Sequence, residues 1–233
     1  MADLKVSVAG VEFHNPLIAA SGTFGFGREY AEFYPLSALG GISSKGITLK
    51  ARPGNPAPRI AEAPGGMLNA VGLQNPGVDH FIEKDLPWLR KQGVTIIANI
   101  AGNTPEDYCA MAEKLNDTDI DMIEMNISCP NVKQGGVQFG TSCAGVEDIT
   151  KAVRAHCKKP LMVKLSPNVT DISEIALAAE SAGADAVSMI NTLTGMRIDI
   201  NTKRPIIHNN TGGFSGPALL PIAVRMVWQT YQK

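Results

Sequence analysis

The residues from Met122 to Asn131 combine side chains that could carry out acid–base chemistry. A short apolar run ends at Asn126, and Cys129, Pro130 and Asn131 follow it in a loop. A buried strand has no physical reason to end in amides and a thiol unless something polar lies beyond it. A cysteine can act as a general base when its pKa is lowered or when a proton path is available. We therefore predict an active site here, with Cys129 as the base.

Lys45 and Lys164 also end apolar runs. The ordinary interpretation of such a lysine is a surface residue whose stem covers apolar area. Two lysines at strand ends are better explained by an anionic ligand, because each supplies a point charge that stabilises negative charge on a cofactor or substrate. We predict that both lysines face a binding site.

Asparagines provide a second signal of ligand binding. Loop asparagines usually form turns, and Asn209 and Asn210 fit that interpretation. At the mouth of one site, several asparagines would present both donors and acceptors. They could then bind a pyrimidine-like ring, whose edge alternates N–H and C=O groups. The candidates are Asn69, Asn99, Asn126, Asn131 and Asn191.

The other cysteines are interpreted as small apolar residues, the usual role of cysteine. Cys109, Cys143 and Cys157 form no Cys-x-x-Cys pair, and the four histidines show no metal-ligand spacing. This usage argues against a metal in the chain and fits reduced thiols in a cytoplasm. The N-terminus lacks the apolar core of a signal peptide, and no run approaches the roughly 18 apolar residues of a membrane helix. We expect a cytoplasmic protein that does not enter a membrane.

The elements that must position these residues repeat one pattern: an apolar run, a polar residue at its end, a loop and a helical pattern. Continuous apolar strands alternating with helices predict a parallel sheet buried on both faces. Polar residues at the carboxyl ends of many strands favour a (β/α)8 TIM barrel over an open α/β sheet, which binds ligands at one crevice. The runs cover residues 17–20, 41–44, 95–98, 122–125, 161–163 and 186–190.

Thr104 and Pro105 mark the start of one helix, and further helices are predicted over 148–157, 172–182 and 217–231. The last helix ends almost at the final residue, so only about six of the eight strand–helix units are present. We expect residues 1–233 to be a single barrel domain that lacks its C-terminal strands and comes from a longer protein. The proline-rich segment 50–76 is predicted as a long functional loop.

Five motifs follow one another along the whole chain: Lys45-Gly46-Ile47-Thr48, Asn69 to Gly77, Asn126 to Asn131, Lys164-Leu165-Ser166-Pro167 and Gly212 to Pro217. Together and in this order they resemble the class 1 dihydroorotate dehydrogenases. The run from Gly72 to Gly77 resembles the NAD-linked B subclass. The resemblance implies an FMN-binding flavoprotein that oxidises (S)-dihydroorotate to orotate in pyrimidine (UMP) biosynthesis.

The resemblance also implies roles for individual residues. Cys129 and Lys45 would be catalytic, with Cys129 taking the C5 proton while hydride leaves C6 for N5 of FMN. The loop 130–140, with Gly135 and Gly136 as a hinge, would close over the substrate. Substrate contacts would come from Lys45, Asn69, Ala70, Val71, Gly72, Leu73, Asn126, Asn131, Asn191 and Thr192. FMN contacts would come from Ser21, Lys45, Gly46, Asn99, Asn126, Lys164, Ile190 and Gly216.

In the B subclass, an electron-transfer subunit carries FAD and a [2Fe–2S] cluster and passes electrons to NAD⁺. The resemblance therefore implies a heterotetramer of two catalytic and two electron-transfer subunits, and the partner must supply the cluster because this chain lacks clustered cysteines.

Alternatives are another FMN barrel that acts on a pyrimidine, similar to dihydropyrimidine dehydrogenase or tRNA dihydrouridine synthase, and a non-catalytic scaffold. The net charge of −1 argues against nucleic acid as a partner.

Overall fold

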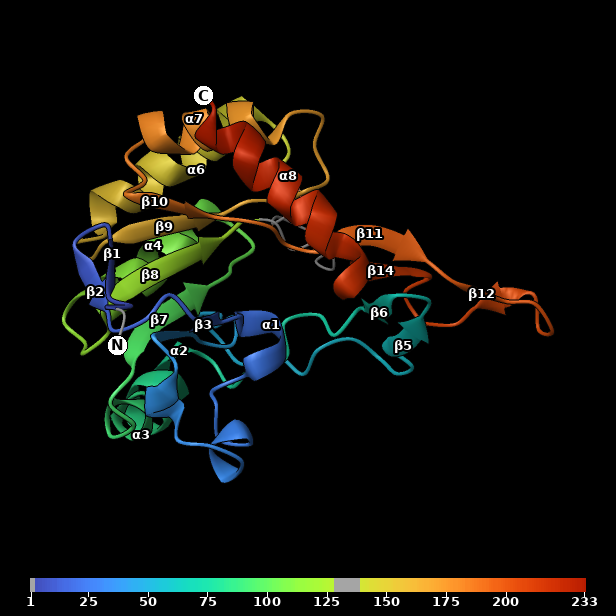
Figure 1. The fold of residues 1–233 in the computed structure, drawn as a ribbon, viewed down its shortest axis with the longest axis horizontal. Coiled ribbons are helices and arrows are strands. Elements are labelled where there is room, and N and C mark those ends of the chain that lie inside the picture. Colours follow the sequence, from blue (N-terminus) through green and yellow to red (C-terminus); the bar gives the residue numbers. More distant parts are fainter. Residues whose placement is uncertain (1–2, 128–138) are drawn as a thin grey trace.

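The computed structural model describes residues 3–127 and 139–233, in which six parallel strands form one curled sheet (Figure 1). The spatial order is β10-β9-β8-β7-β4-β3, so strands that follow one another along the sheet also follow one another along the chain. This is the arrangement of consecutive units of a (β/α) barrel, and it confirms the predicted fold class. The strands are β3 (Ile18–Ala19), β4 (Gly41–Ser43), β7 (Thr95–Ile100), β8 (Met122–Asn126), β9 (Leu161–Lys164) and β10 (Ala186–Ser188).

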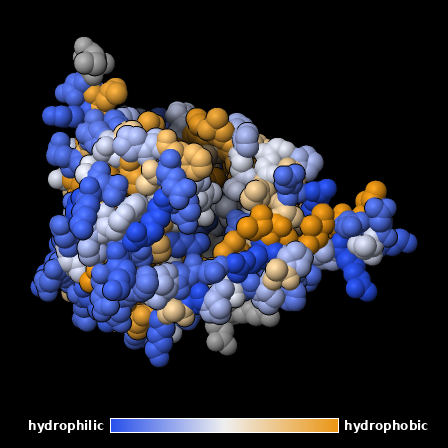
Figure 2. Space-filling model, turned by 90° about the horizontal axis from the view of Figure 1, so that it is seen from below, coloured by the Kyte–Doolittle hydropathy of each residue, from blue (hydrophilic) through white to orange (hydrophobic). Residues whose placement is uncertain are grey.

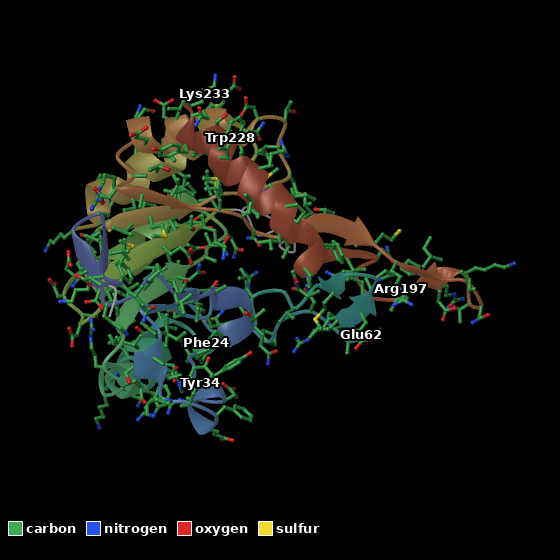
Figure 3. All side chains as sticks on the ribbon, in the orientation of Figure 1. Phe24, Tyr34, Glu62, Arg197, Trp228 and Lys233 are labelled. Atoms are coloured by element: carbon green, nitrogen blue, oxygen red, sulfur yellow. The ribbon has the colours of Figure 1, made fainter. Side chains whose placement is uncertain are left out.

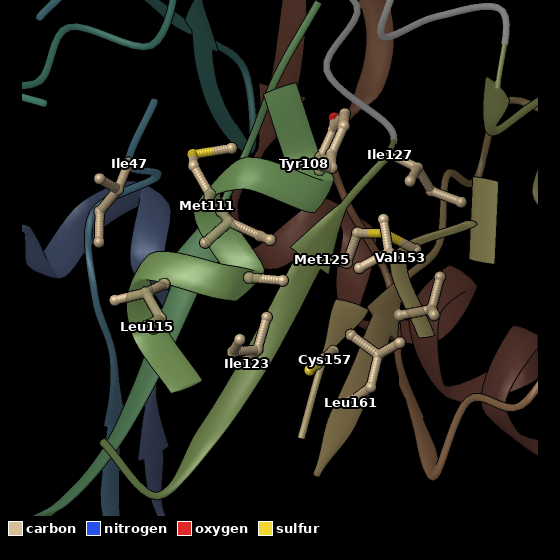
Figure 4. Packing of buried hydrophobic residues seen from close by; sticks show 14 of the residues in the cluster. Ile47, Tyr108, Met111, Leu115, Ile123, Met125, Ile127, Val153, Cys157 and Leu161 are labelled. Atoms are coloured by element: carbon tan, nitrogen blue, oxygen red, sulfur yellow. The ribbon is translucent and has the colours of Figure 1, made fainter. Parts of the chain in front are cut away.

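Three long helices cover the outer face of this sheet: α4 (Pro105–Asn116), α6 (Cys143–His156) and α7 (Ile172–Ser181). Ile123, Met125 and Leu161 of the strands pack there against Leu115 and Val153 of the helices (Figure 4). Burial of this apolar surface is the main force that holds the helices to the sheet.

Side-chain hydrogen bonds to the backbone mark where the long helices begin. Thr104 accepts a hydrogen bond from the Asp107 backbone N–H at 3.3 Å, as predicted for the start of α4. The predicted helix 148–157 begins earlier, because Ser142 caps the N-terminus of α6 by accepting from the Gly145 N–H. The helix predicted over 172–182 corresponds to α7.

A hairpin of β1 (Val6–Val8) and β2 (Val11–Phe13) closes the N-terminal end of the barrel. Phe13 is fully buried with Ile97, Met122 and Met162, which point inward from three barrel strands. This cluster fills the lower part of the interior with apolar side chains.

A second sheet projects from the carboxyl ends of the barrel strands (Figure 1). Its antiparallel strands, in spatial order, are β11 (Leu193–Met196), β14 (Thr211–Ser215), β6 (Gly66–Asn69) and β5 (Ile60–Ala63). Next to it, β12 (Ile198–Asp199) pairs with β13 (Arg204–Pro205). Arg197 donates to the Glu62 carbonyl and ties this extension to β5 (Figure 3).

The prediction that 50–76 is one long loop was therefore wrong in part. Strands β5 and β6 occupy its second half and pair around the turn at Pro64 and Gly65. The prolines at 53, 56 and 58 precede β5, so they do not interrupt the strand pairing.

Apolar side chains gather on the surface of the projecting part (Figure 2). The exposed apolar residues of its strands and turns are Ile60, Met67, Met196, Ile198 and Ile200.

The remaining helical elements are short, apart from α8 (Leu220–Tyr231), which packs on α7 (Figure 1). Within the described residues, no helix combines the length and the apolar character that crossing a membrane requires. The short elements are α1 (Ser21–Phe24), η1 (Tyr30–Glu32), η2 (Leu36–Ala38), α2 (Val78–His80), η3 (Phe81–Asp85), α3 (Leu86–Arg90) and η4 (Pro217–Leu219).

Candidate active site

A layer of polar side chains lies inside the barrel, above the apolar cluster. Successive residues of a strand point to opposite faces, so Asn99 and Glu124 share the inward face with Ile97 and Met122. Three side chains from different strands donate hydrogen bonds to the carboxylate of Glu124. They are Ser43 Oγ of β4 at 2.5 Å, Asn99 Nδ2 of β7 at 2.5 Å and Ser188 Oγ of β10 at 2.7 Å.

Glu124 is a buried anion held by its surroundings. Its residue is 4% exposed, and this burial alone would raise the pKa of the carboxyl. The charge of Lys164 and the hydrogen bonds from Ser188, Ser43 and Asn99 outweigh the burial and hold the pKa of Glu124 below its ordinary value. The carboxylate is therefore ionised at neutral pH, and it places negative charge beside Lys164.

Lys164 lies in the same layer, at the end of β9. Its neighbours across the sheet are Asn126 of β8 and Ser188 of β10. Its ammonium group donates to Ser21 Oγ at 3.5 Å, which joins the buried start of α1 to the opposite part of the barrel. The structure thus brings together Ser21 and Lys164, two of the predicted flavin contacts.

Asn99, Gly46 and Leu73 meet at the mouth of the barrel. A methyl group built on Gly46 would lie 3.0 Å from Asn99 Oδ1 and 3.1 Å from Leu73 Cδ2. Asn99 is fully buried, and its Oδ1 has no hydrogen-bond partner among the residues that the structure describes. A buried acceptor left in this way is costly unless a ligand satisfies it.

Asn126 and Asn191 form a pair of amides above this layer. Asn191 Nδ2 donates to Asn126 Oδ1 at 3.3 Å, and the backbone N–H of Thr192 donates to Asn191 Oδ1 at 2.8 Å. Tyr108 of α4 donates its hydroxyl to the Asn126 carbonyl at 2.8 Å and so supports the end of β8. The predicted substrate residues Asn126, Asn191 and Thr192 are in contact.

The loop that follows β6 is held in place by Asn75, which is 6% exposed. Its Oδ1 accepts from the N–H groups of Thr48 and Gly77, while its Nδ2 donates to Thr48 Oγ1 and to the Leu73 carbonyl at 2.7 Å. Gly72 adopts φ +76°, and a methyl group there would lie 2.5 Å from the Asn55 amide. The loop is therefore tied to the segment after β4.

Asn69, the last residue of β6, precedes this loop and donates from Nδ2 to the Gly213 carbonyl at 3.4 Å. A methyl group on Gly213 would overlap Thr192, so the projecting sheet reaches the Asn191–Thr192 corner through β14. The loop residues Ala70 and Val71 follow Asn69, and Ala70 is fully buried.

Two of the predicted flavin residues, Ile190 and Gly216, make their described contacts away from the polar layer. Ile190 packs against the core between sheet and helices. Gly216 contacts Gly65 and Gly66, at the opposite end of β6 from Asn69. Lys45 is half-buried and is the second residue after β4, and its backbone N–H donates to the Gly25 carbonyl.

The predicted base Cys129, the substrate residue Asn131 and most of the predicted closing loop 130–140 lie outside the described residues. Ile127 and Gly140, on either side of these residues in the chain, lie close together: a methyl group on Gly140 would be 2.5 Å from the Ile127 carbonyl oxygen.

The sequence analysis missed the residue at the centre of the polar layer. Glu124 lies in the apolar run of β8, and Ser43 and Ser188 lie in two others. A single acidic residue within a buried strand was the available signal, since such a group must be paired. Its partners could not be read from the sequence because they come from three other strands.

Outside this layer, the thiols of Cys109 and Cys157 are unsuited to acid–base catalysis. Burial, followed by the charges of Glu106 and Glu113, raises the pKa of Cys109. Burial also raises the pKa of Cys157. Among the described residues, no cluster of His, Cys, Asp or Glu could hold a metal ion.

Comparisons with known proteins agree with this architecture. The protein-family model described as Dihydroorotate dehydrogenase matches residues 3–233. A relative from Alkaliphilus metalliredigens is 60% identical over 227 residues, which cover 97% of this chain and 75% of the relative. A relative from Bacteroides thetaiotaomicron is 57% identical over 230 residues, which cover 98% of this chain and 76% of the relative. Both relatives are named Dihydroorotate dehydrogenase B (NAD(+)), catalytic subunit.

A solved structure has the same fold. The crystal structure of DHODH in complex with ferulenol from Eimeria tenella matches with a TM-score of 0.74 at 22% identity, covering 99% of this chain and 70% of that chain. Identity this low supports the fold alone, which is the barrel described above.

Proposed function

The chain belongs to the dihydroorotate dehydrogenase family, and from that premise we propose how its barrel oxidises dihydroorotate to orotate in pyrimidine biosynthesis. The protein is a flavin-dependent oxidoreductase of the NAD-linked B type. The observation that supports the proposal best is the set of polar side chains at the carboxyl ends of β7, β8 and β9, where Asn99, Asn126 and Lys164 lie together.

The residues present fit FMN as the cofactor. Asn99 Oδ1 is a buried acceptor without a partner in the described residues, and it suits an N–H donor of a flavin ring. Gly46 has no side chain to fill the space beside this acceptor. Lys164 supplies positive charge at this site, with the carboxylate of Glu124 nearby. The residues that we propose for FMN are Ser21, Lys45, Gly46, Asn99, Asn126, Lys164, Ile190 and Gly216.

When bound, FMN supplies the hydride acceptor of the reaction. The chain's own residues bind and orient the substrate and move its proton. Asn126 and Asn191 present amide donors and acceptors that match the alternating N–H and C=O groups of the dihydropyrimidine ring. Cys129 takes the proton from C5 of the substrate as its general base.

Charge stabilisation comes from the lysines. Lys164 stabilises negative charge that develops at the cofactor, and Lys45 is positioned after β4 to attract the substrate's anionic charge. The loop from Asn69 to Leu73 completes the substrate site and is held by Asn75. Asn131 and Thr192 are the remaining proposed substrate contacts.

The first test is the visible absorbance of the purified protein, recorded before and after anaerobic addition of dihydroorotate. We expect flavin bands that bleach with wild-type protein. Cys129→Ala should retain the bands but lose roughly 10²- to 10⁴-fold in the stopped-flow rate of bleaching, the usual contribution of a general base. The matched control is Cys143→Ala, an exposed thiol that should leave the rate unchanged.

Bleaching of Cys129→Ala at close to the wild-type rate would show that another group removes the proton. Dihydrouracil, which lacks the carboxylate, serves as the substrate control. Equal bleaching by dihydrouracil and dihydroorotate would favour a different pyrimidine as the natural substrate.

The relatives' name, catalytic subunit, implies a separate electron-transfer subunit. We propose that this partner carries FAD and a [2Fe–2S] cluster, passes electrons to NAD⁺, and joins the catalytic subunits in a heterotetramer with two copies of each. Cysteine usage supports a cytoplasmic location as part of the same proposal. Native mass spectrometry of the purified complex measures the stoichiometry, and a different subunit ratio would contradict it.

A further inference from the structure

Glu124 determines which end of the Asn99 amide faces the barrel mouth. An ionised carboxylate accepts hydrogen bonds and donates none. Since Glu124 Oε2 lies 2.5 Å from the Asn99 amide, only the NH₂ end of that amide can face it. A reversed amide would place two acceptor oxygens against each other inside the barrel, where such a contact is strongly unfavourable. Asn99 is therefore held with its oxygen turned away from Glu124.

The direction of this oxygen is set by its surroundings. Asn99 Oδ1 points to Gly46, which lies beyond the carboxyl end of β4, and Leu73 borders the same space. The backbone of Asn99 is also fixed, because its N–H donates to Ser44 Oγ at 3.1 Å and its carbonyl accepts from the Ile47 N–H at 2.8 Å. The amide can rotate only about its side-chain bonds, and Glu124 prevents that rotation.

We propose, resting on the proposed function, that Glu124 is a positioning residue that holds Asn99 Oδ1 toward the bound flavin to accept its N3–H. This N–H is the sole ring N–H of an oxidised isoalloxazine and lies between two carbonyl groups. The acceptor for this N–H must therefore be small and must face it with its oxygen rather than with an NH₂ group. A freely rotating Asn99 would present its NH₂ group to N3–H half of the time.

Two flavins that differ only at this atom test the proposal. The dissociation constants of FMN and 3-methyl-FMN are measured by fluorescence titration of the flavin-depleted full chain. In 3-methyl-FMN the N–H is replaced, so Asn99 Oδ1 stays unsatisfied. We expect wild-type protein to bind 3-methyl-FMN about tenfold more weakly than FMN, or weaker still.

Variants at Glu124 separate positioning from a general structural role. In Glu124→Leu the amide can turn, so FMN must select the correct orientation and the ratio of the two dissociation constants should fall about twofold. A merely structural effect would weaken both flavins by the same factor and leave the ratio unchanged. Glu124→Gln should retain the wild-type ratio, because its carbonyl can replace Oε2 while its NH₂ group donates to Ser188 Oγ.

Asn99→Ala keeps the test decisive if Glu124→Leu does not fold, since it removes the acceptor itself. A wild-type ratio in Asn99→Ala or in Glu124→Leu would overturn the proposal, as would equal affinities of wild-type protein for both flavins. If dihydroorotate still bleaches the wild-type flavin in that last case, the proposed function stands and only this inference fails. Wild-type protein that binds neither flavin would overturn both.

Discussion

Among single residues, Glu124 contributes most to the order of the site because one carboxylate is hydrogen-bonded by side chains from three other strands. Its contacts to Ser43, Asn99 and Ser188 span β4 to β10. Removing one partner of such a buried charge leaves the others unpaired, which is strongly destabilising.

The lowered pKa of Glu124 predicts an effect of pH on stability. The unfolded carboxyl, with its ordinary pKa of 4.5, binds more protons than the folded one as the pH falls. The stabilisation by Glu124 is therefore fully present above pH 4.5 and is lost as the pH falls through the folded pKa. Urea unfolding of wild type and Glu124→Gln between about pH 3 and 6 measures this. We expect a shallower acid loss in the variant; parallel curves would contradict the assignment.

Among the elements, the loop between β6 and α2 shows how an irregular segment is made rigid. Its glycine at position 72 adopts a positive φ, and Asn75 uses both ends of its amide to connect the loop to Thr48. An irregular segment with this many internal hydrogen bonds is suited to hold a ligand in one geometry, because the segment loses little further conformational entropy when the ligand binds.

Asn75→Asp tests this element because it keeps the shape and removes the two donors. It places an acceptor oxygen where the amide donated to the Leu73 carbonyl at 2.7 Å, and the two oxygens repel. We expect the KM for dihydroorotate to rise about fivefold or more, from a loss of about 1 kcal/mol, with flavin content retained. Steady-state kinetics measure it, and an unchanged KM would show that the loop does not position the substrate.

In the molecule as a whole, the interior of the barrel is divided into two layers. The β1–β2 hairpin closes the N-terminal end with Phe13 over Met122 and Met162, and the polar layer with Glu124 occupies the carboxyl end. Stability and ligand binding therefore depend on different ends of the barrel, as is general for this architecture.

Phe13→Ala tests whether stability and ligand binding depend on different ends of the barrel. Phe13 is fully buried, so the substitution should destabilise the protein by roughly 3–5 kcal/mol through lost burial and a cavity. Below the unfolding transition, the flavin affinity of the remaining folded protein should be unchanged. Phe33→Ala is the matched control, because Phe33 is 81% exposed and its loss should change stability by less than about 0.5 kcal/mol. Denaturant unfolding and flavin titration give both quantities, and a parallel loss of affinity would show that the layers are coupled.

The elements of the barrel were predictable from the sequence because their determinants are local. The six parallel strands are continuous apolar runs, and Thr104 and Pro105 mark the start of α4. The strand-end residues Lys164, Asn126 and Asn191 were predicted to share a site because parallel strands bring their carboxyl ends to one edge. The structure places Asn126 beside Lys164 and in hydrogen-bond contact with Asn191. The projecting sheet was missed because β5 and β6 are short and pair with β14, which lies far away in the sequence.

The fold class, the strand ends and the family resemblance were predictable from the sequence alone, because all three depend on local pattern and on order along the chain. Only the tertiary structure revealed that Glu124 accepts hydrogen bonds from Ser43, Asn99 and Ser188. It also showed that Gly46 lies beside Asn99 Oδ1, which has no partner among the residues that the structure describes. These contacts join residues from different strands, and they depend on which side chains share the inward face and on the curl of the sheet. A buried carboxylate needs partners, but which residues become its partners is decided by the closing of the barrel.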